Sequence, residues 1–443
     1  MKTIIRPKLF RDPVHDIIAF NAHDDVEHVL LELIQTRTFQ RLRRIRQLGF
    51  AHAVYHGAEH SRFSHSLGVV HVARRMFDSL HRQGNFDPVH DRLEVLCAAL
   101  LHDIGHGPFS HAIEKVTGIH HEHYTAQFIL NPDSEIYDVL HAADKTLPQR
   151  LAPYFAIGET IPPEKRALKE IVSSQLDADR QDYILRDGVA TGVRIGVYDF
   201  ERIQNMFEVH TSTLPDGSTQ NRLAVSYRAR EAVEDYLIAR FHMFKQVYLH
   251  KAVRAAEKML TAVFSRARDL LLEEDERLVL TPSPARELIR GDKLDLPEFL
   301  ELDDTDVWVL LKQWSHHPDA ILARLSRGLL DRNLYKTIDL DRDDPVLVAR
   351  TIDRANEMAR DLGYDPAYAV LTDRAQDTPY RPYNPRDRKN STSYIPIINR
   401  QGEAEPIEHV SDLIHLLGND SYKVWRICLP TEVREAMRRH NYI

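Results

Sequence analysis

The 443-residue sequence is poor in cysteine, with only Cys97 and Cys428. Two cysteines this far apart provide neither a disulfide framework nor a zinc site built from several thiolates. The sequence also lacks an apolar run of about 18 residues, which a membrane-spanning helix requires. Its first residues, MKTIIRPKLFRDPVHD, lack the apolar segment of a secretion signal. We therefore expect a soluble cytoplasmic protein with no membrane partner.

Positive charge is in the minority, because 58 Lys and Arg face 66 Asp and Glu, for a net charge of -8. This balance argues against a protein that coats nucleic acid. The basic segment RPYNPRDRK (381–389) is more typical of a solvated loop than of a contact for single-stranded nucleic acid. Histidine, in contrast, is abundant at 25 residues, and imidazole serves both metal binding and proton transfer near neutral pH.

Helical periodicity dominates the sequence. In 93–104, LEVLCAALLHDI, apolar residues recur every three or four positions, and Gly105, Gly107 and Pro108 then end the helix. Further helices are expected over 66–82, 166–187 and 228–274, two strands within 211–226, a hairpin within 393–410 and a strand over 422–430. The predicted fold is mainly α, with a helical domain over residues 1–330 and a smaller mixed α/β domain over 331–443.

The most informative segment is LLHDIGHGPFSH (100–111). His102 and Asp103 lie about 100° apart on a helix, so both reach one ion only if it lies beyond the helix end. Further ligands must come from other helices, and the sequence offers His65 in RFSHSLGV and Asp179 in DADRQDYILRD. Imidazole and carboxylate together suit a divalent ion such as Mn, Fe or Mg. Each residue alone fits a cap or a solvated position, but the set favours a metal site.

Asp179, Tyr183 and Asp187 are spaced by four residues and form one stripe along a helix. The stripe fits a solvated face neutralised by Arg180 and Arg186. It fits equally well a metal ligand followed by two groups that hold a sugar hydroxyl. The spacing leaves both interpretations open.

Four ordered blocks, RFSHSLGV, LLHDIGHGPFSH, HEHYT and DADRQDYILRD, carry a resemblance to a known family. They resemble the HD-domain metal-dependent phosphohydrolases. More narrowly, FQRLRRIRQLGFAHAVYHGAEHSRFSHSLGVV (39–70) is similar to the deoxynucleoside triphosphate triphosphohydrolases of the SAM-and-HD-domain type and their bacterial relatives. The likeness runs from about Phe10 to Lys336, and no SAM domain is expected before it.

The resemblance implies roles for individual residues, beginning with one divalent ion per site held by His65, His102, Asp103 and Asp179. His111 would be the general acid near the leaving 5′ oxygen, with His106 and His121 contacting phosphate. The other implied substrate contacts are Arg62, Arg180 and Arg240 at the triphosphate, Gln47, Leu48, Tyr183 and Asp187 at the sugar, and Tyr248 along the sugar and base.

The sequence departs from its relatives at several of these places. Asp16 follows His15 where relatives usually have Gly, and Phe244 and Leu249 occupy positions that are polar in relatives. Gln35 occupies the position at which regulated relatives have an acidic residue that binds guanine. Residues resembling regulatory phosphate contacts remain at Arg43, Arg332 and Lys336. The resemblance therefore implies a homo-oligomer, dimer or tetramer, with an activating nucleotide, accompanied by additional Mg, whose base is open.

The expected reaction is metal-dependent hydrolysis of a dNTP to a deoxynucleoside and inorganic triphosphate. One alternative is another enzyme of the same superfamily, a phosphodiesterase or a hydrolase of a signalling nucleotide, which would share the ion but not the sugar contacts. A second alternative is a non-catalytic sensor that binds a nucleotide or nucleic acid. The role of the last hundred residues is open.

Overall fold

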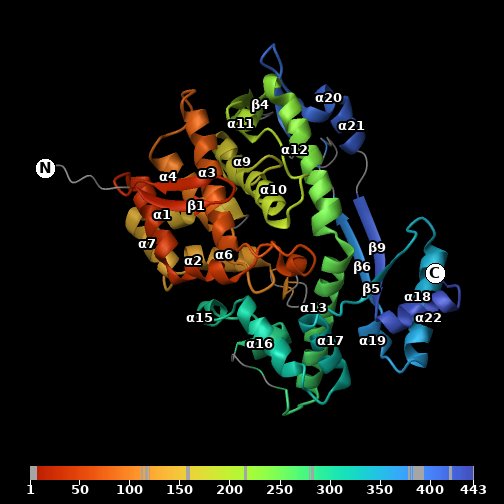
Figure 1. The fold of residues 1–443 in the computed structure, drawn as a ribbon. Helices are drawn as coiled ribbons and strands as arrows, with labels where there is room; N and C mark the ends of the chain where they lie inside the picture. The colour runs from red at the N-terminus through yellow and green to blue at the C-terminus, as the bar shows by residue number, and fades with distance from the viewer. Residues whose placement is uncertain are drawn as a thin grey trace.

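The structure is a computed structural model that describes residues 7–442 except 111–112, 115–117, 119, 156–159, 214–216, 279, 281–283, 378–379, 381, 383–393 and 419–421. Helices make up most of it, and the strands form three small sheets (Figure 1). The prediction of a mainly α fold with small mixed sheets in its C-terminal part is confirmed.

The helices and strands follow one another along the whole described chain. The helices are α1 (Asp25–Gln35), α2 (Arg37–Arg41), α3 (Arg62–His81), α4 (His90–Leu101), α6 (His121–Leu130), α7 (Glu135–Ala143), α8 (Leu147–Leu151), α9 (Arg166–Val172), α10 (Ala178–Thr191), α11 (Phe200–Gln204), α12 (Arg230–Met243), α13 (Lys251–Leu272), α14 (Ala285–Arg290), α15 (Leu296–Leu300), α16 (Asp304–Trp314), α17 (Ala320–Leu330), α18 (Pro345–Asp361), α19 (Pro366–Ala369), α20 (Ile407–Val410), α21 (Asp412–Gly418) and α22 (Thr431–Arg439). The strands are β1 (Lys8–Asp12), β2 (Asp16–Phe20), β3 (Phe207–Thr213), β4 (Thr219–Ser226), β5 (Lys336–Asp339), β6 (Leu371–Asp377), β7 (Pro396–Ile398), β8 (Ala404–Pro406) and β9 (Tyr422–Leu429).

The centre of the helical part is α3, which packs against α4 on one side and α10 on another. Helix α4 is buried along nearly its whole length, because Val95 through Leu101 are all fully buried. Burial of this many apolar side chains is the main favourable term in folding. The helices expected at 66–82 and 93–104 are confirmed as α3 and α4, although α4 ends at Leu101 and places His102 at its C-cap.

The single helix expected over 166–187 is wrong, because the chain forms α9 and α10 with a break at 173–177. Ser173 is extended at φ -146° and ψ 94°. Asp177 caps α10, since its side chain accepts a hydrogen bond from the Arg180 backbone N–H at 2.7 Å. Leu176 within the break is nevertheless buried, so it fits the apolar pattern of a continuous helix. The preference of Asp for the N-cap position instead starts a new helix at this point.

The long helix expected over 228–274 is also interrupted. A π-helical turn over Phe244–Tyr248 separates α12 from α13, and His250 then caps α13 with its side chain accepting from the Ala252 N–H. The segment contains neither Gly nor Pro, so no residue announces the break. Single π-turns inside helices occur frequently at functional sites.

The strand predictions are confirmed. Strands β3 and β4 pair antiparallel within 207–226, β7 and β8 form the hairpin expected in 393–410, and β9 occupies 422–429. The last part of the 393–410 segment is helix α20 rather than strand, and most of the basic segment 381–389 lies outside the described residues.

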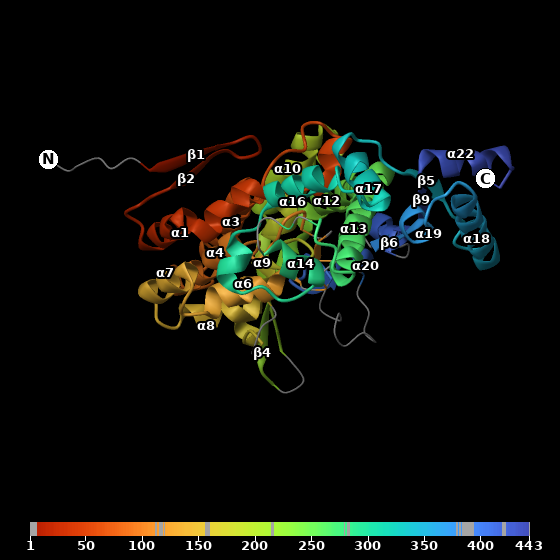
Figure 2. The same ribbon diagram turned by 90° about the horizontal axis from the view of Figure 1, so that it is seen from below.

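The C-terminal part of the chain packs in two places. Strands β5, β9 and β6 form one sheet with α18, α19 and α22 beside it, at the opposite end of the molecule from the β1–β2 hairpin (Figure 2). Strand β7 instead joins β4 in parallel, with Val225 opposite Ile397. The domain boundary near residue 330 stays a prediction. No helix in the described part of the chain combines the length and apolar composition needed to cross a membrane.

Candidate metal centre and active site

Three helices bring His65, His102 and Asp179 together. His65 lies in the first turn of α3, His102 directly follows α4, and Asp179 lies in the first turn of α10, which Asp177 caps. All three residues thus lie at helix ends, and the ends of three helices can meet at one point more closely than their middles can. One ligand atom from each residue lies within 4.8 Å of the other two.

The distances within this set suit one small cation. His65 Nε2 lies 3.3 Å from His102 Nε2 and 3.0 Å from Asp179 Oδ1, and His102 Nε2 lies 3.7 Å from Asp179 Oδ1. Asp103 adjoins the set, with Oδ1 3.4 Å from His102 Nε2 and Oδ2 3.9 Å from His65 Nε2. The structure thus brings all four predicted ligands together.

The Nδ1 atoms of His65 and His102, which face away from the cluster, each have a hydrogen-bond partner. His65 Nδ1 lies 2.8 Å from Asp182 Oδ2, and His102 Nδ1 lies 2.8 Å from the Ala99 carbonyl oxygen. Both partners are acceptors, so in the neutral ring that binds a metal Nδ1 carries the proton and the Nε2 lone pair points into the cluster. The donor set of two imidazole nitrogens and two carboxylates fits a divalent ion.

Electrostatics favour a positive charge at this point. Burial alone would lower the pKa of His65, but the hydrogen bonds that the protonated ring donates to Asp179 and Asp182 outweigh burial and raise the pKa to about 10. Burial would raise the pKa of Asp103, yet Arg62 together with the neighbouring imidazoles holds it well below the usual range. The carboxylates therefore stay ionised and attract a cation.

Arg62 does not project freely into the site. Its Nη1 donates to Asp103 Oδ2 at 2.5 Å, and its Nε donates to Ser110 Oγ at 3.0 Å. The side chain is 5% exposed. Its contact is thus to a predicted metal ligand, and its predicted contact with a triphosphate stays a prediction.

A second group of side chains lies beside Asp103. His106 Nε2 is 3.1 Å from Asp103 Oδ1, its ring stacks on that of His121 at 3.8 Å, and His121 Nδ1 lies 2.6 Å from Glu114 Oε1. Burial and Arg62 hold the pKa of His106 well below its usual value. Burial opposes a charge on His121, but its bond to Glu114 outweighs this and raises the pKa. The predicted general acid, His111, lies outside the described residues.

The pKa values of the stacked imidazoles are thus shifted in opposite directions. These opposite shifts favour the neutral form of His106, which offers an acceptor, and the charged form of His121, which offers a donor. Groups of this kind can orient a phosphate and transfer a proton.

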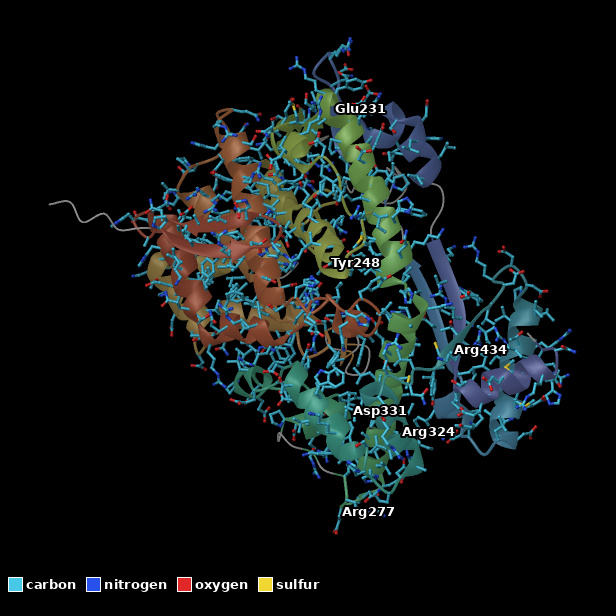
Figure 3. The ribbon with its side chains drawn as sticks, viewed as in Figure 1. Glu231, Tyr248, Arg277, Arg324, Asp331 and Arg434 are labelled. Atoms are coloured by element: carbon cyan, nitrogen blue, oxygen red, sulfur yellow. The ribbon has the colours of Figure 1, made fainter. Side chains whose placement is uncertain are left out.

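The stripe of α10 faces the interior, as one of its two interpretations required. Asp187 is buried, its Oδ1 accepting from His60 Nε2 at 2.7 Å and its Oδ2 from the Tyr248 hydroxyl at 2.8 Å. Tyr248 belongs to the π-turn and lies at the centre of the molecule (Figure 3). The Tyr183 ring lies 6.0 Å from that of Tyr248 and 6.5 Å from that of His65. A solvated acidic face is thereby excluded for Tyr183 and Asp187.

Two arginines approach the same stripe. Arg180 donates through Nε to the Ser174 carbonyl oxygen at 2.7 Å. Arg240 is 5% exposed, and its Nε and Nη1 are buried without a hydrogen-bond acceptor among the described residues. Both guanidinium groups act to lower the pKa of Tyr183, although burial outweighs them and raises it. A buried guanidinium with unmet donors is costly unless an anion meets it.

The remaining predicted contacts lie on several separate elements. Gln47 and Leu48 precede the short 3-10 helix of Gly49–Ala53, and the side-chain oxygen of Gln47 is buried without a donor among the described residues. Arg43 is exposed and stacks over the Phe63 ring at 3.5 Å. Arg332 donates to the Ala53 carbonyl oxygen at 2.6 Å, and Lys336 is exposed at the start of β5.

Comparison with known proteins agrees with this geometry. The family model described as HD domain matches residues 62–183, and the model described as HD associated region matches 217–441. The uncharacterized protein YwfO of Bacillus subtilis is 34% identical over 409 residues, which cover 92% of this chain and 88% of that protein. A crystal structure of a phosphohydrolase from Bacteroides thetaiotaomicron has a TM-score of 0.76 and 31% identity, covering 96% of this chain and 100% of that one.

More distant similarity reaches a eukaryotic protein. The deoxynucleoside triphosphate triphosphohydrolase SAMHD1 homolog of Dictyostelium discoideum is 29% identical over 352 residues, which cover 75% of this chain and 60% of that protein. Fold and site together define a metal-dependent phosphohydrolase with a divalent-metal cluster of His and Asp. The chain belongs to the HD-domain family, and the predicted resemblance is confirmed.

Several residues of the site were not singled out from the sequence. They are His60, which holds Asp187, Glu114, which holds His121, and Asp182, which holds His65. Only Asp182 left a readable signal, because Arg186 follows it by four residues on the same helix and forms an ion pair with it.

Proposed function

We propose that the protein hydrolyses deoxynucleoside triphosphates to a deoxynucleoside and inorganic triphosphate. The observation that carries the proposal is Arg240, whose buried guanidinium has two nitrogens without an acceptor among the described residues and acts electrostatically on Tyr183 of the α10 stripe. A charged phosphate chain supplies the missing acceptors. The name of the Dictyostelium relative, a deoxynucleoside triphosphate triphosphohydrolase, supports the same substrate class.

His65, His102, Asp103 and Asp179 would hold the divalent ion. When bound, the ion supplies Lewis-acid activation of a phosphate and lowers the pKa of water. Mn, Fe and Mg all suit the donor set. No residue of the set selects one of them.

The chain's own residues supply the other steps. Arg180 and Arg240 hold the phosphate chain and stabilise the charge that develops on its oxygens. His106 and His121 orient the phosphate, and an imidazole donates a proton to the departing 5′ oxygen, a role we assign to His111. Such an acid contributes about 10²–10⁴-fold in rate.

The buried stripe provides the sugar contacts. Asp187, fixed by His60 and Tyr248, accepts a hydrogen bond from a sugar hydroxyl. Tyr183 crowds the 2′ position, so a ribose fits badly. Gln47 and Leu48 close the sugar pocket, and Tyr248 lies along the sugar and base.

Regulation belongs to the same proposal. Arg43, Arg332 and Lys336 are exposed cations that would bind the phosphates of an activating nucleotide in a dimer or tetramer. A nucleotide that enters such a site brings its own Mg.

The experiment is a product assay on the purified protein. Each dNTP, alone and in a mixture of four, is incubated with Mn or Mg and followed by phosphorus NMR and nucleoside chromatography. Triphosphate and deoxynucleoside in equal amounts are expected, and activity confined to the mixture supports a regulatory site. Release of phosphate or pyrophosphate favours the alternative of another enzyme of the same superfamily, and binding without turnover favours the sensor.

A further inference from the structure

The metal ligand His65 is held from behind by a buried carboxylate, Asp182. Asp182 lies one turn after Asp179 on α10, and its Oδ2 is 2.8 Å from His65 Nδ1. The side chain of Asp182 is 0% exposed and that of His65 is 1% exposed. The orientation of the His65 ring therefore depends on where this carboxylate lies.

Asp182 accepts hydrogen bonds from four N–H donors. Oδ2 receives His65 Nδ1 and Arg186 Nε, both at 2.8 Å. Oδ1 receives His15 Nε2 at 2.6 Å and Arg186 Nη2 at 3.0 Å. Two donors on each oxygen use the acceptor capacity of a carboxylate fully. Removing the His15 donor leaves one acceptor site of Oδ1 unfilled and weakens the constraint on the orientation of the carboxylate.

His15, the donor from the N-terminal hairpin, lies 167 positions before Asp182 in the sequence. Asp12 fixes the turn between β1 and β2, because its Oδ1 accepts from the backbone N–H groups of Val14 and His15 at 2.9 and 3.0 Å. Asp12 Oδ2 accepts from Arg186 Nη1 at 2.8 Å. Arg186 thus ties the turn and Asp182 together.

Two backbone features allow this approach. Asp16 adopts a positive φ of 59°, a conformation that Asp tolerates better than most residues because its side chain bonds locally. On α3, a Cβ atom at Gly68 would lie 1.9 Å from Asp182 Oδ1, so this glycine leaves the room that the carboxylate occupies. The turn reaches the body of the molecule near α10, while the strands extend away from it (Figure 2).

We propose that His15 is a positioning residue of the metal centre. Through Asp182 it fixes the ring orientation and tautomer of His65, so that Nε2 points to the ion. The N-terminal hairpin is accordingly part of the metal site. This inference rests on the metal centre of the proposed function, but not on the identity of the substrate.

The chemistry behind the proposal is general. A metal-bound imidazole donates its other N–H to a carboxylate or carbonyl, and loss of that partner weakens metal binding by about 10–100-fold. Here the carboxylate itself is positioned by a further imidazole. Loss of His15 is expected to act on the affinity for the ion even though the ring lies outside the ligand set.

The test compares metal binding by His15→Ala, His15→Gln and wild-type protein, each freed of metal and titrated with Mn²⁺. Co²⁺ is used in parallel, because its visible absorption reports the geometry of the ligands. His71→Ala is the matched control, since the His71 ring packs 4.9 Å from that of His15 and bonds to Arg74. Circular dichroism and thermal unfolding establish that each variant is folded.

His15→Ala is expected to weaken Mn²⁺ binding by about 10-fold or more and to shift the Co²⁺ absorption. His15→Gln, which keeps an N–H donor, is expected to recover most of the affinity, and His71→Ala to match the wild type. If His15→Ala fails to fold, His15→Gln and Asp12→Asn carry the test, and Asp12→Asn is expected to weaken binding.

Wild-type affinity and spectrum in His15→Ala would overturn the proposal, as would an equal loss in His71→Ala. If wild-type protein binds no ion, the proposed function falls, and this inference falls with it. If the wild type binds the ion but hydrolyses no dNTP, only the substrate assignment fails, and the comparison of variants still decides the role of His15.

Discussion

The Nε2 atoms of His65 and His102 face each other across 3.3 Å, although the residues are 37 positions apart in the sequence. Each ring has its Nδ1 bonded to an acceptor, Asp182 for His65 and the Ala99 carbonyl for His102. Two lone pairs this close repel unless a proton or a cation lies between them. The relationship is the geometric basis for the metal centre.

Replacement of one of these imidazoles should abolish metal binding. His102→Ala is expected to reduce the bound metal from one ion per chain to a trace and to remove activity with it, because a site of mixed imidazole and carboxylate loses a quarter of its donors. Metal content by mass spectrometry after dialysis is the measurement. His90→Ala, at an exposed position at the start of α4, is the control, and a His102→Ala protein that retains stoichiometric metal would refute the ligand assignment.

Arg240 should act on substrate binding rather than on the metal. Arg240→Ala removes charged hydrogen bonds worth about 1.5–3 kcal/mol each, so KM for the dNTP is expected to rise by about 10-fold or more while the metal content stays the same. Arg75→Ala, which breaks an exposed pair with Glu201, provides the control. Initial-rate kinetics check the prediction, and an unchanged KM would contradict it.

Tyr183 should set the preference for deoxyribose. Tyr183→Ala makes room beside the sugar, and the ratio of rates for ribonucleotides and deoxynucleotides is expected to rise by about 10-fold or more, the order that a single steric contact supplies. The comparison uses kcat/KM for dGTP and GTP under the same metal. A preference equal to that of the wild type would show that another residue excludes the 2′ hydroxyl.

Asp304 should make stability depend on pH. Its side chain accepts from the backbone N–H groups of Phe109 and Arg46 at 2.8 and 2.9 Å, and burial raises its pKa from 3.8 to about 6. Between these values the folded state binds more protons than the unfolded state, so the free energy of unfolding falls as pH rises through this window. The contribution is at most about 3 kcal/mol, since each pKa unit corresponds to about 1.4 kcal/mol.

Urea unfolding of wild type and Asp304→Asn at about pH 4 and about pH 7 isolates this effect. Relative to the variant, the wild type is expected to be more stable at the lower pH than at the higher. Asp343→Asn, on an exposed side chain, controls for the loss of a surface charge. A stability difference independent of pH would mean that Asp304 is not the titrating group.

Much of the site could be predicted from local spacing. Helical periodicity predicted that Asp179, Tyr183 and Asp187 share one face of a helix, and the structure places all three on α10. The spacing could not distinguish a solvated face from a buried one, because that depends on which residues pack against the stripe. Here Tyr248 and His60 bury Asp187 from positions 61 and 127 residues away.

The breaks at 173–177 and 244–248 were missed for a related reason. Both keep the apolar pattern and contain no Gly or Pro, so the periodicity continues through them, and at 173–177 the N-cap preference of Asp177 was the one signal against a continuous helix. The contact of His15 with Asp182 likewise depends on tertiary packing across 167 positions. Sequence reasoning identified the residues that carry recognisable chemistry and missed those that hold them in place.

The most direct test of the account is hydrolysis of a dNTP in water labelled with oxygen-18. Water attack on the α-phosphorus with departure of the 5′ oxygen predicts one labelled oxygen in the inorganic triphosphate and none in the deoxynucleoside, in a reaction that stops when the metal is removed. Label in the 5′ hydroxyl of the nucleoside, or in released phosphate or pyrophosphate, would contradict the proposed reaction.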